Sequence, residues 1–227
     1  FFKFINKIET ILMDHTISNL LTIREEINLK NYKNLKIISV SKTFNSEQIL
    51  PLVKFGHIDF GENKVQEAIE KWSNIKNEYS DLKLHMIGKL QTNKVKFAVN
   101  IFDYIHSVDS IKLAKKIALE QNKAKRNLKL FIQINIGNET QKSGINPEEV
   151  KKFIHICRDD LKLNVIGLMC IPPNDDKTEN YFAKMFKLKN DLNLAELSMG
   201  MSNDYHIAVK YGTTFLRIGS KIFGKRN

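Results

Sequence analysis

The stretch LKIISVSKTF, residues 35 to 44, sets the pattern on which the fold depends. Ile37, Ile38 and Val40 form a short, β-branched apolar run, which is typical of a buried strand. The run is followed by Lys42, an amine held between Ser41 and Thr43. A charged side chain directly after a buried strand indicates a place where the chain leaves the core and can carry chemistry.

Similar apolar runs recur along the chain and are separated by segments with helical spacing. The predicted strands lie at 36–41, 58–60, 83–87, 103–106, 129–136, 164–169, 196–199 and 214–218. A leading amphipathic helix is predicted over roughly 4 to 30, and the helix after the first strand is predicted to be preceded by Ser46 and closed by Gly56. Strands that alternate with helices pair in parallel, because each parallel return needs a crossover.

This alternation predicts an α/β protein, a single (β/α)8 TIM barrel that occupies residues 1–227 as one domain with an extra N-terminal helix. The alternative is an open, doubly wound sheet, which normally has roughly five to seven strands. No internal repeat or Pro/Gly-rich linker interrupts the pattern.

Composition bounds the class of protein. The 227 residues include 42% hydrophobic residues, which is enough for a sizeable core, and no apolar run approaches the length that spans a bilayer. Two cysteines without CxxC spacing, Cys157 and Cys170, argue against a disulfide scaffold. We therefore expect a soluble, cytoplasmic protein with reduced thiols and no membrane partner.

The formal net charge of +11 favours anionic ligands. Its lysines are scattered through helical segments, without an arginine-rich strip or a helix-turn-helix spacing, so we expect no nucleic-acid partner. His85, His106 and His155 are dispersed, which predicts no metal site. His85 and His106 fall in or beside predicted strands and are interpreted as hydrogen-bonded structural residues.

Polar residues follow the predicted strands, where a parallel barrel carries its active site. They include Lys42, Glu62, Asn63, Ser107, Asn135, Ser198, Arg217, Gly219 and Ser220. Gly219 and Ser220 follow the last strand and precede a short helical segment, so their backbone N–H groups could hold a phosphate, although a tight turn explains the same pair. The segment LSMGMS adds Ser198, Gly200 and Ser202 from the preceding strand.

Closure of a barrel would bring the first strand beside the eighth, and so Lys42 beside this anion cradle. Partial burial of the lysine would favour its neutral, nucleophilic form, which condenses with aldehydes. A small molecule that carries both a phosphate and an aldehyde is pyridoxal 5'-phosphate (PLP). Arg217 could reach the pyridine nitrogen of such a ring, where a cation disfavours ring protonation and weakens the ring as an electron sink.

The sequence also resembles a known family. The blocks SVSKT, DFGENKVQEA, HMIGKLQTNK, IHSVDS, KSGI, GLMCIPP, LSMGMSNDYHIAV and TTFLRIGSKIFG occur in order between about residues 36 and 225 and are similar to those of the pyridoxal phosphate homeostasis protein family, the YggS or PROSC type. The resemblance implies a barrel like the N-terminal domain of alanine racemase. It also implies PLP as cofactor, Lys42 as the Schiff-base lysine, Ser198, Gly219 and Ser220 as phosphate ligands, Arg217 as the partner of the pyridine nitrogen, and Asn63 as a pocket residue.

The resemblance further implies a role in vitamin B6 and amino-acid homeostasis, with amino acids and PLP-accepting apo-enzymes as candidate partners and no established catalytic residue. Racemases of this type use a second base from a C-terminal domain, and the sequence ends at Asn227, soon after the last predicted strand. We therefore expect a PLP carrier without catalytic turnover. The alternative is a single-domain, PLP-dependent amino-acid racemase that uses Lys42 alone.

Overall fold

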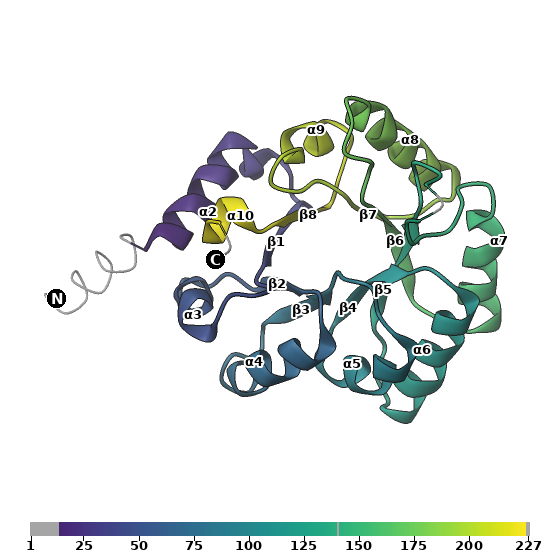
Figure 1. Ribbon diagram of the computed structural model, residues 1–227, viewed down its shortest axis with the longest axis horizontal. Coiled ribbons are helices and arrows are strands. Elements are labelled where there is room, and N and C mark those ends of the chain that lie inside the picture. Colours follow the sequence, from purple (N-terminus) through teal and green to yellow (C-terminus); the bar gives the residue numbers. More distant parts are fainter. Residues whose placement is uncertain (1–13, 140, 226–227) are drawn as a thin grey trace, which may run out of the picture.

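The computed structural model describes residues 14–139 and 141–225. Its strands are β1 (Lys36–Val40), β2 (Asp59–Glu62), β3 (Lys83–Met86), β4 (Tyr104–Val108), β5 (Lys129–Ile134), β6 (Val165–Cys170), β7 (Glu196–Ser198) and β8 (Phe215–Ile218). Each strand pairs in parallel with the next, and β1 pairs with β8, so that the sheet closes into a barrel (Figure 1). The closed barrel confirms the predicted (β/α)8 fold and excludes the open, doubly wound sheet.

Helices surround the strands (Figure 1). They are α2 (His15–Glu26), α3 (Ser46–Lys54), α4 (Val65–Glu78), α5 (Val95–Ile101), α6 (Ile111–Lys123), α7 (Val150–His155), α8 (Thr178–Asp191), α9 (Tyr205–Lys210) and α10 (Ser220–Phe223), with short turns η1 (Leu29–Asn31) and η2 (Thr92–Lys94) and a π-helical turn η3 (Ile156–Asp160). Every predicted strand overlaps an observed one, which confirms the alternating pattern.

Two predicted helix boundaries differ from the structure. The leading helix, predicted over roughly 4 to 30, ends at Glu26 as α2, and its predicted residues 4–13 lie outside the described residues. Ser46 is not the residue before its helix but the first residue of α3. The N-cap is Asn45, whose side chain accepts from the backbone N–H of Gln48 in a reciprocal capping box.

The barrel interior is filled by large side chains from several strands. Ile38, Tyr104, Phe131, Met169 and Phe215 form a buried cluster that is separate from the larger core between the strands and the helices. Because consecutive residues of a strand point to opposite faces, one set of alternate residues fills the barrel and the other packs against the helices. The barrel is therefore a packed core, and ligands are confined to its ends.

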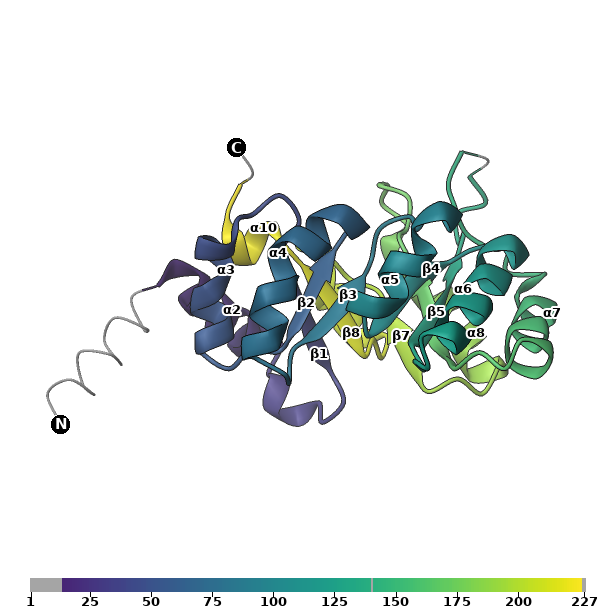
Figure 2. The same cartoon turned by 90° about the horizontal axis from the view of Figure 1, so that it is seen from below.

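Closure of the barrel places the two chain ends of the described region beside each other. α2 packs against α10, where Asn19 Nδ2 donates to the carbonyl oxygen of Ile222 at 2.9 Å (Figures 1 and 2). In the same region β1 and β8 pair with Ser39 opposite Ile218. The turn that follows β1 and the turn that follows β8 are consequently neighbours.

Candidate functional site

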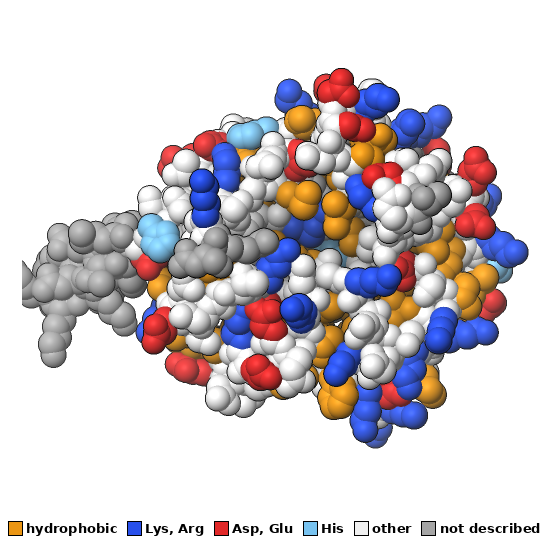
Figure 3. Space-filling model, viewed as in Figure 1, with side chains coloured by type: hydrophobic (Ala, Val, Ile, Leu, Met, Phe, Trp, Pro, Cys, Tyr) orange, Lys and Arg blue, Asp and Glu red, His pale blue; other side chains and the backbone are white. Residues whose placement is uncertain are grey.

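A cavity of about 270 Å³ opens at the carboxyl ends of the strands. Its polar lining residues are Lys42, Asn63, Ser202, Asn203, Arg217 and Ser220, and its other lining residues are Val40, Ile87, Ile171, Met201 and Gly219. In the space-filling view along the barrel axis, Lys and Arg side chains lie around the hollow at the centre of the ring of helices (Figure 3). An amine, a guanidinium and two serine hydroxyls therefore share one small cavity with apolar walls.

The cavity brings together most of the residues singled out from the sequence. Lys42, Asn63, Arg217, Gly219 and Ser220 all line it, although they come from turns and strands far apart in the chain. A Cβ at Gly219 would lie 3.3 Å from Val40 Cβ, so the glycine allows the turn after β8 to pack closely against the end of β1.

Ser198 lies outside the cavity lining. Its side chain is fully buried, and its Oγ accepts a hydrogen bond from Arg217 Nη1 at 2.7 Å and lies 2.9 Å from His106 Nδ1. Ser202, which the sequence places in the same segment, lines the cavity instead. Its Oγ lies 3.5 Å from the backbone nitrogen of Lys221, so the turns after β7 and β8 are linked. Strand periodicity alone could not distinguish the two hydroxyls, because the chain bends after β7.

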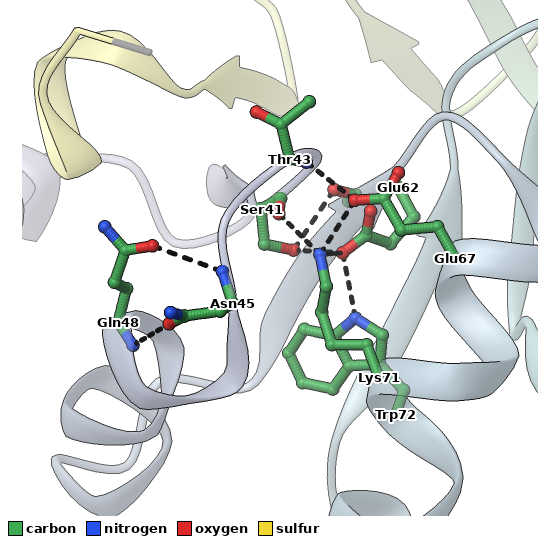
Figure 4. A network of polar contacts seen from close by, with 9 residues as sticks. Ser41, Thr43, Asn45, Gln48, Glu62, Glu67, Lys71 and Trp72 are labelled. Carbon is green, nitrogen blue, oxygen red and sulfur yellow. Dashed lines mark hydrogen bonds and ion pairs between the residues drawn. The ribbon is translucent and has the colours of Figure 1, made fainter. Parts of the chain in front are cut away.

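Lys42 is half-buried in the turn that follows β1. The next residue, Thr43, has a φ of 70°, a left-handed conformation that is uncommon for a β-branched residue. The turn is held from α4: Thr43 N–H donates to Glu67 Oε1 at 2.6 Å, and Lys71 Nζ donates to the carbonyl oxygen of Ser41 at 2.8 Å (Figure 4). The backbone on both sides of Lys42 is thus anchored to one helix.

Glu62 connects this anchor to the sheet. Its buried carboxylate accepts three hydrogen bonds at Oε1, from Ser41 Oγ at 2.8 Å, Lys71 Nζ at 2.9 Å and Trp72 Nε1 at 2.9 Å (Figure 4). Burial raises the pKa of Glu62, and the three donors oppose that shift. The sequence pattern indicates Glu62 only as a polar residue after a strand. Glu67 and Lys71, four residues apart in α4, were not singled out, although this spacing is a recognised ion-pair signal on helices.

Arg217 reaches the cavity from within the barrel. It is 4% exposed, and besides its bond to Ser198 its Nη2 donates to the carbonyl oxygen of Cys170 at 2.8 Å. Burial lowers the pKa of the guanidinium from its ordinary value. An arginine in such a position remains cationic at neutral pH and presents a fixed fork of N–H donors.

His85 and His106 are fully buried and hydrogen-bonded, which confirms their interpretation as structural residues. In the part of the chain that the structure describes, no group of three or more His, Cys, Asp or Glu side chains is placed to hold a metal ion. Within residues 14–139 and 141–225, every helix is too short or too polar to cross a lipid bilayer.

Comparisons with known proteins agree with this geometry. A model of the family described as alanine racemase, N-terminal domain, matches residues 11–227. A pyridoxal phosphate homeostasis protein of Haemophilus influenzae is 38% identical over 208 residues, which cover 87% of this chain and 88% of the relative. Another protein of this name, from Aquifex aeolicus, is 37% identical over 200 residues, which cover 84% and 87% of the two chains.

Solved structures show the same likeness. PipY of Synechococcus elongatus PCC7942, solved with PLP bound, has a TM-score of 0.81 and 33% identity, with 91% of this chain and 99% of that chain covered. Alanine racemase of Clostridium difficile 630 has a TM-score of 0.73 at 17% identity, with 92% of this chain and 56% of that chain covered, which shows a shared fold. By its family model, its relatives and its barrel, the chain belongs to the alanine racemase N-terminal domain family and, within it, to the pyridoxal phosphate homeostasis proteins.

Proposed function

We propose that this chain binds PLP as a Schiff base on Lys42 and serves in PLP and amino-acid homeostasis, without catalytic turnover. The observation that carries the proposal is the sharing of one cavity by Lys42, Arg217, Gly219 and Ser220. PLP, when bound, supplies an aldehyde that condenses with amines and a conjugated ring that withdraws electrons. The related PipY, a structure of which contains PLP, supports the same cofactor here.

The residues present fit the two ends of this ligand. For the phosphate we propose Ser202, Gly219 and Ser220, because all three line the cavity at the linked turns after β7 and β8. Ser198, which the family resemblance implied as a phosphate ligand, lies outside the lining and accepts a hydrogen bond from Arg217, so we propose that it holds Arg217 instead. Asn63 remains a proposed pocket residue on the side of the cavity next to β2.

Arg217 bears on the choice between a carrier and an enzyme. A guanidinium facing the pyridine nitrogen disfavours its protonation, and an unprotonated ring stabilises a carbanion poorly. Arg217 is held by two fixed acceptors, Ser198 and the Cys170 carbonyl oxygen. This arrangement disfavours transaminase-like chemistry and is compatible with a protein that holds PLP without turnover.

The wider proposal concerns the chain as a whole and its partners. We propose that residues 1–227 form one domain, a proposal supported by the family match over residues 11–227. Candidate partners are free amino acids and apo-enzymes that accept PLP transiently. The buried, unpaired thiols of Cys157 and Cys170 support a cytoplasmic location.

The test of the cofactor site is optical and chemical. The protein incubated with PLP should gain a visible absorption band that borohydride abolishes, and peptide mass spectrometry should find the reduced adduct on Lys42. Lys42→Arg should lose the band, whereas Lys89→Arg, at an exposed position after β3, should keep it. An adduct that maps to another lysine in the wild-type protein would refute the assignment.

A single-domain racemase remains the second candidate, since the fold is that of the alanine racemase barrel. The two candidates differ in proton exchange at the Cα of amino acids in deuterated buffer. The carrier proposal predicts no sustained exchange by the loaded protein. Exchange at catalytic rates that disappears in Lys42→Arg would establish the racemase instead.

A further inference from the structure

The interior of the barrel contains a row of hydrogen-bonded polar side chains that begins at Arg217. Arg217 Nη1 donates to Ser198 Oγ at 2.7 Å, and Ser198 Oγ lies 2.9 Å from His106 Nδ1. His106 Nε2 lies 3.0 Å from His85 Nδ1, and His85 Nε2 lies 3.0 Å from Asp59 Oδ1. The row therefore crosses the barrel from β8 and β7 to β4, β3 and the first residue of β2.

The row is buried and tightly packed. Ser198, His85 and His106 are fully buried. The ring of His85 stacks on Tyr104 and that of His106 on Phe131, each with ring centroids 4.2 Å apart. Stacking fixes the planes of both imidazoles, so each ring nitrogen is directed at one neighbour in the row.

Chemistry fixes the direction of every bond. The pKa of Asp59 is lowered, so its carboxylate is ionised at pH 7 and only accepts, and His85 must donate from Nε2. Burial lowers the pKa of both histidines, so each is neutral and carries one N–H. His85 Nδ1 then accepts from His106 Nε2–H, which leaves His106 Nδ1 as an acceptor. The proton of Ser198 is donated to that nitrogen, and the lone pairs of Ser198 Oγ face Arg217.

The same direction follows from the other end, because the guanidinium has donors and no acceptor. Arg217 donates to Ser198 Oγ. The Ser198 hydroxyl hydrogen points toward His106 Nδ1 and therefore away from Arg217. With the Cys170 carbonyl oxygen as second acceptor, both terminal nitrogens of the fork are fixed. Arg217, fixed in this way, also lines the cavity.

We propose that Ser198 and His106 are positioning residues for Arg217, and that the Asp59 carboxylate orients this row of hydrogen bonds from the opposite end of the barrel. The inference rests on the proposed function, in which Arg217 faces the ring nitrogen of PLP. Its consequence is that a change deep in the barrel, far from the cavity, alters how the bound ring is held.

The first experiment needs no cofactor. Long-range ¹H–¹⁵N NMR spectra of the full chain at pH 7, with ¹⁵N-labelled histidine, distinguish the two neutral tautomers. We expect His85 and His106 both as the Nε2–H form, with signals assigned by single substitutions. His57 serves as an internal reference, because its Nε2 lies 2.9 Å from the carbonyl oxygen of Asp59. A protonated His106, or His106 in the Nδ1–H form, would overturn the proposed direction.

The second experiment measures PLP affinity and the pH dependence of the visible band in two variants at one position. His106→Leu removes the acceptor for Ser198, and we expect affinity to fall on the order of tenfold, as for a lost hydrogen bond that supports a charged group. His106→Asn keeps an acceptor near Ser198, and we expect it to restore most of the affinity and the wild-type pH profile. Unchanged binding in His106→Leu, or equal losses in both variants, would overturn the positioning role.

A matched control is His57→Asn, which removes another buried imidazole, one that contacts the row only at the backbone carbonyl oxygen of Asp59. It should leave PLP affinity within about twofold of the wild type, and circular dichroism should show that every variant is folded. The two proposals fail differently. Wild-type protein that never binds PLP removes the proposed function, whereas wild-type binding with the wrong tautomers removes only this inference.

Discussion

Lys71 Nζ lies 2.8 Å from the carbonyl oxygen of Ser41, the residue directly before Lys42. The same ammonium group is 2.9 Å from Glu62 Oε1 and 3.0 Å from Glu67 Oε1, and its side chain is only 7% exposed. One buried cation from α4 thus holds the turn of the proposed cofactor lysine to the sheet and to the helix.

Replacing this cation should destabilise the protein. Lys71→Met leaves the Glu62 carboxylate buried without its partner, and the free energy of unfolding should fall by about 3–5 kcal/mol, as measured by urea denaturation. PLP affinity should fall as well, because the Lys42 turn loses an anchor. Lys116→Met is the control, since its pair with Glu120 is partly exposed and should contribute less than about 1 kcal/mol. Equal losses of stability in the two variants would contradict this anchoring role of Lys71.

Stability should decrease on mild acidification because of buried neutral histidines. His57 is 4% exposed, and burial lowers its pKa from 6.5 to about 4. Between these values the unfolded chain binds a proton that the folded protein does not. Stability from this residue is therefore complete above pH 6.5 and is lost as the pH falls to about 4, by up to about 1.4 kcal/mol per pH unit.

Urea denaturation of the wild type and His57→Asn at several pH values between 7 and 4 measures this contribution. The slope of the unfolding free energy against pH should be smaller in the variant by up to about 1.4 kcal/mol per pH unit, which corresponds to one proton. Burial also lowers the pKa of His85 and His106, so the unfolding free energy of the variant should still fall as the pH falls. Identical slopes in the two proteins would show that folding does not lower the pKa of His57.

The capping box of α3 gives a local prediction. Asn45→Ala removes the side chain that accepts from Gln48 N–H, and it should lower stability by about 1 kcal/mol. Ser46→Ala, at the first helical residue, should change stability by less than about 0.5 kcal/mol. Thermal unfolding of both variants measures these two costs. A larger loss of stability in Ser46→Ala would indicate that Ser46, as predicted from the sequence, is the capping residue.

Two glycines with nearly equal backbone angles separate conformational strain from steric overlap. Gly200 has a φ of 91°, and a Cβ there would lie 2.6 Å from Ala208 Cβ, whereas Gly56 has a φ of 92° with nothing within 4 Å. Gly56→Ala should cost on the order of 1 kcal/mol from strain alone. Gly200→Ala should cost roughly 1–3 kcal/mol more, and it should weaken PLP binding because Ser202 follows in the same turn. Urea denaturation gives both values. Equal costs would mean that the turn after β7 shifts enough to relieve the overlap with Ala208 at little cost in stability.

The alternating apolar and helical segments determined the barrel, because periodicity and parallel pairing are local properties written along the chain. The positions of Lys42, Arg217 and Gly219 at or beside the ends of strands were also visible from the sequence. The hydroxyl at the cavity was not decided by sequence: Ser198 and Ser202 lie in one segment, and only the course of the chain after β7 separates them.

Tertiary structure alone decided the contacts that span distant segments. Lys71 meets Ser41, and Asp59 is joined to Arg217 through two histidines and Ser198, because barrel closure brings these positions together. No spacing along the chain encodes such pairs, since the distance between two strands across a barrel depends on the closure and stagger of the whole sheet. The sequence determined which groups are available, and the closed sheet decided which of them touch.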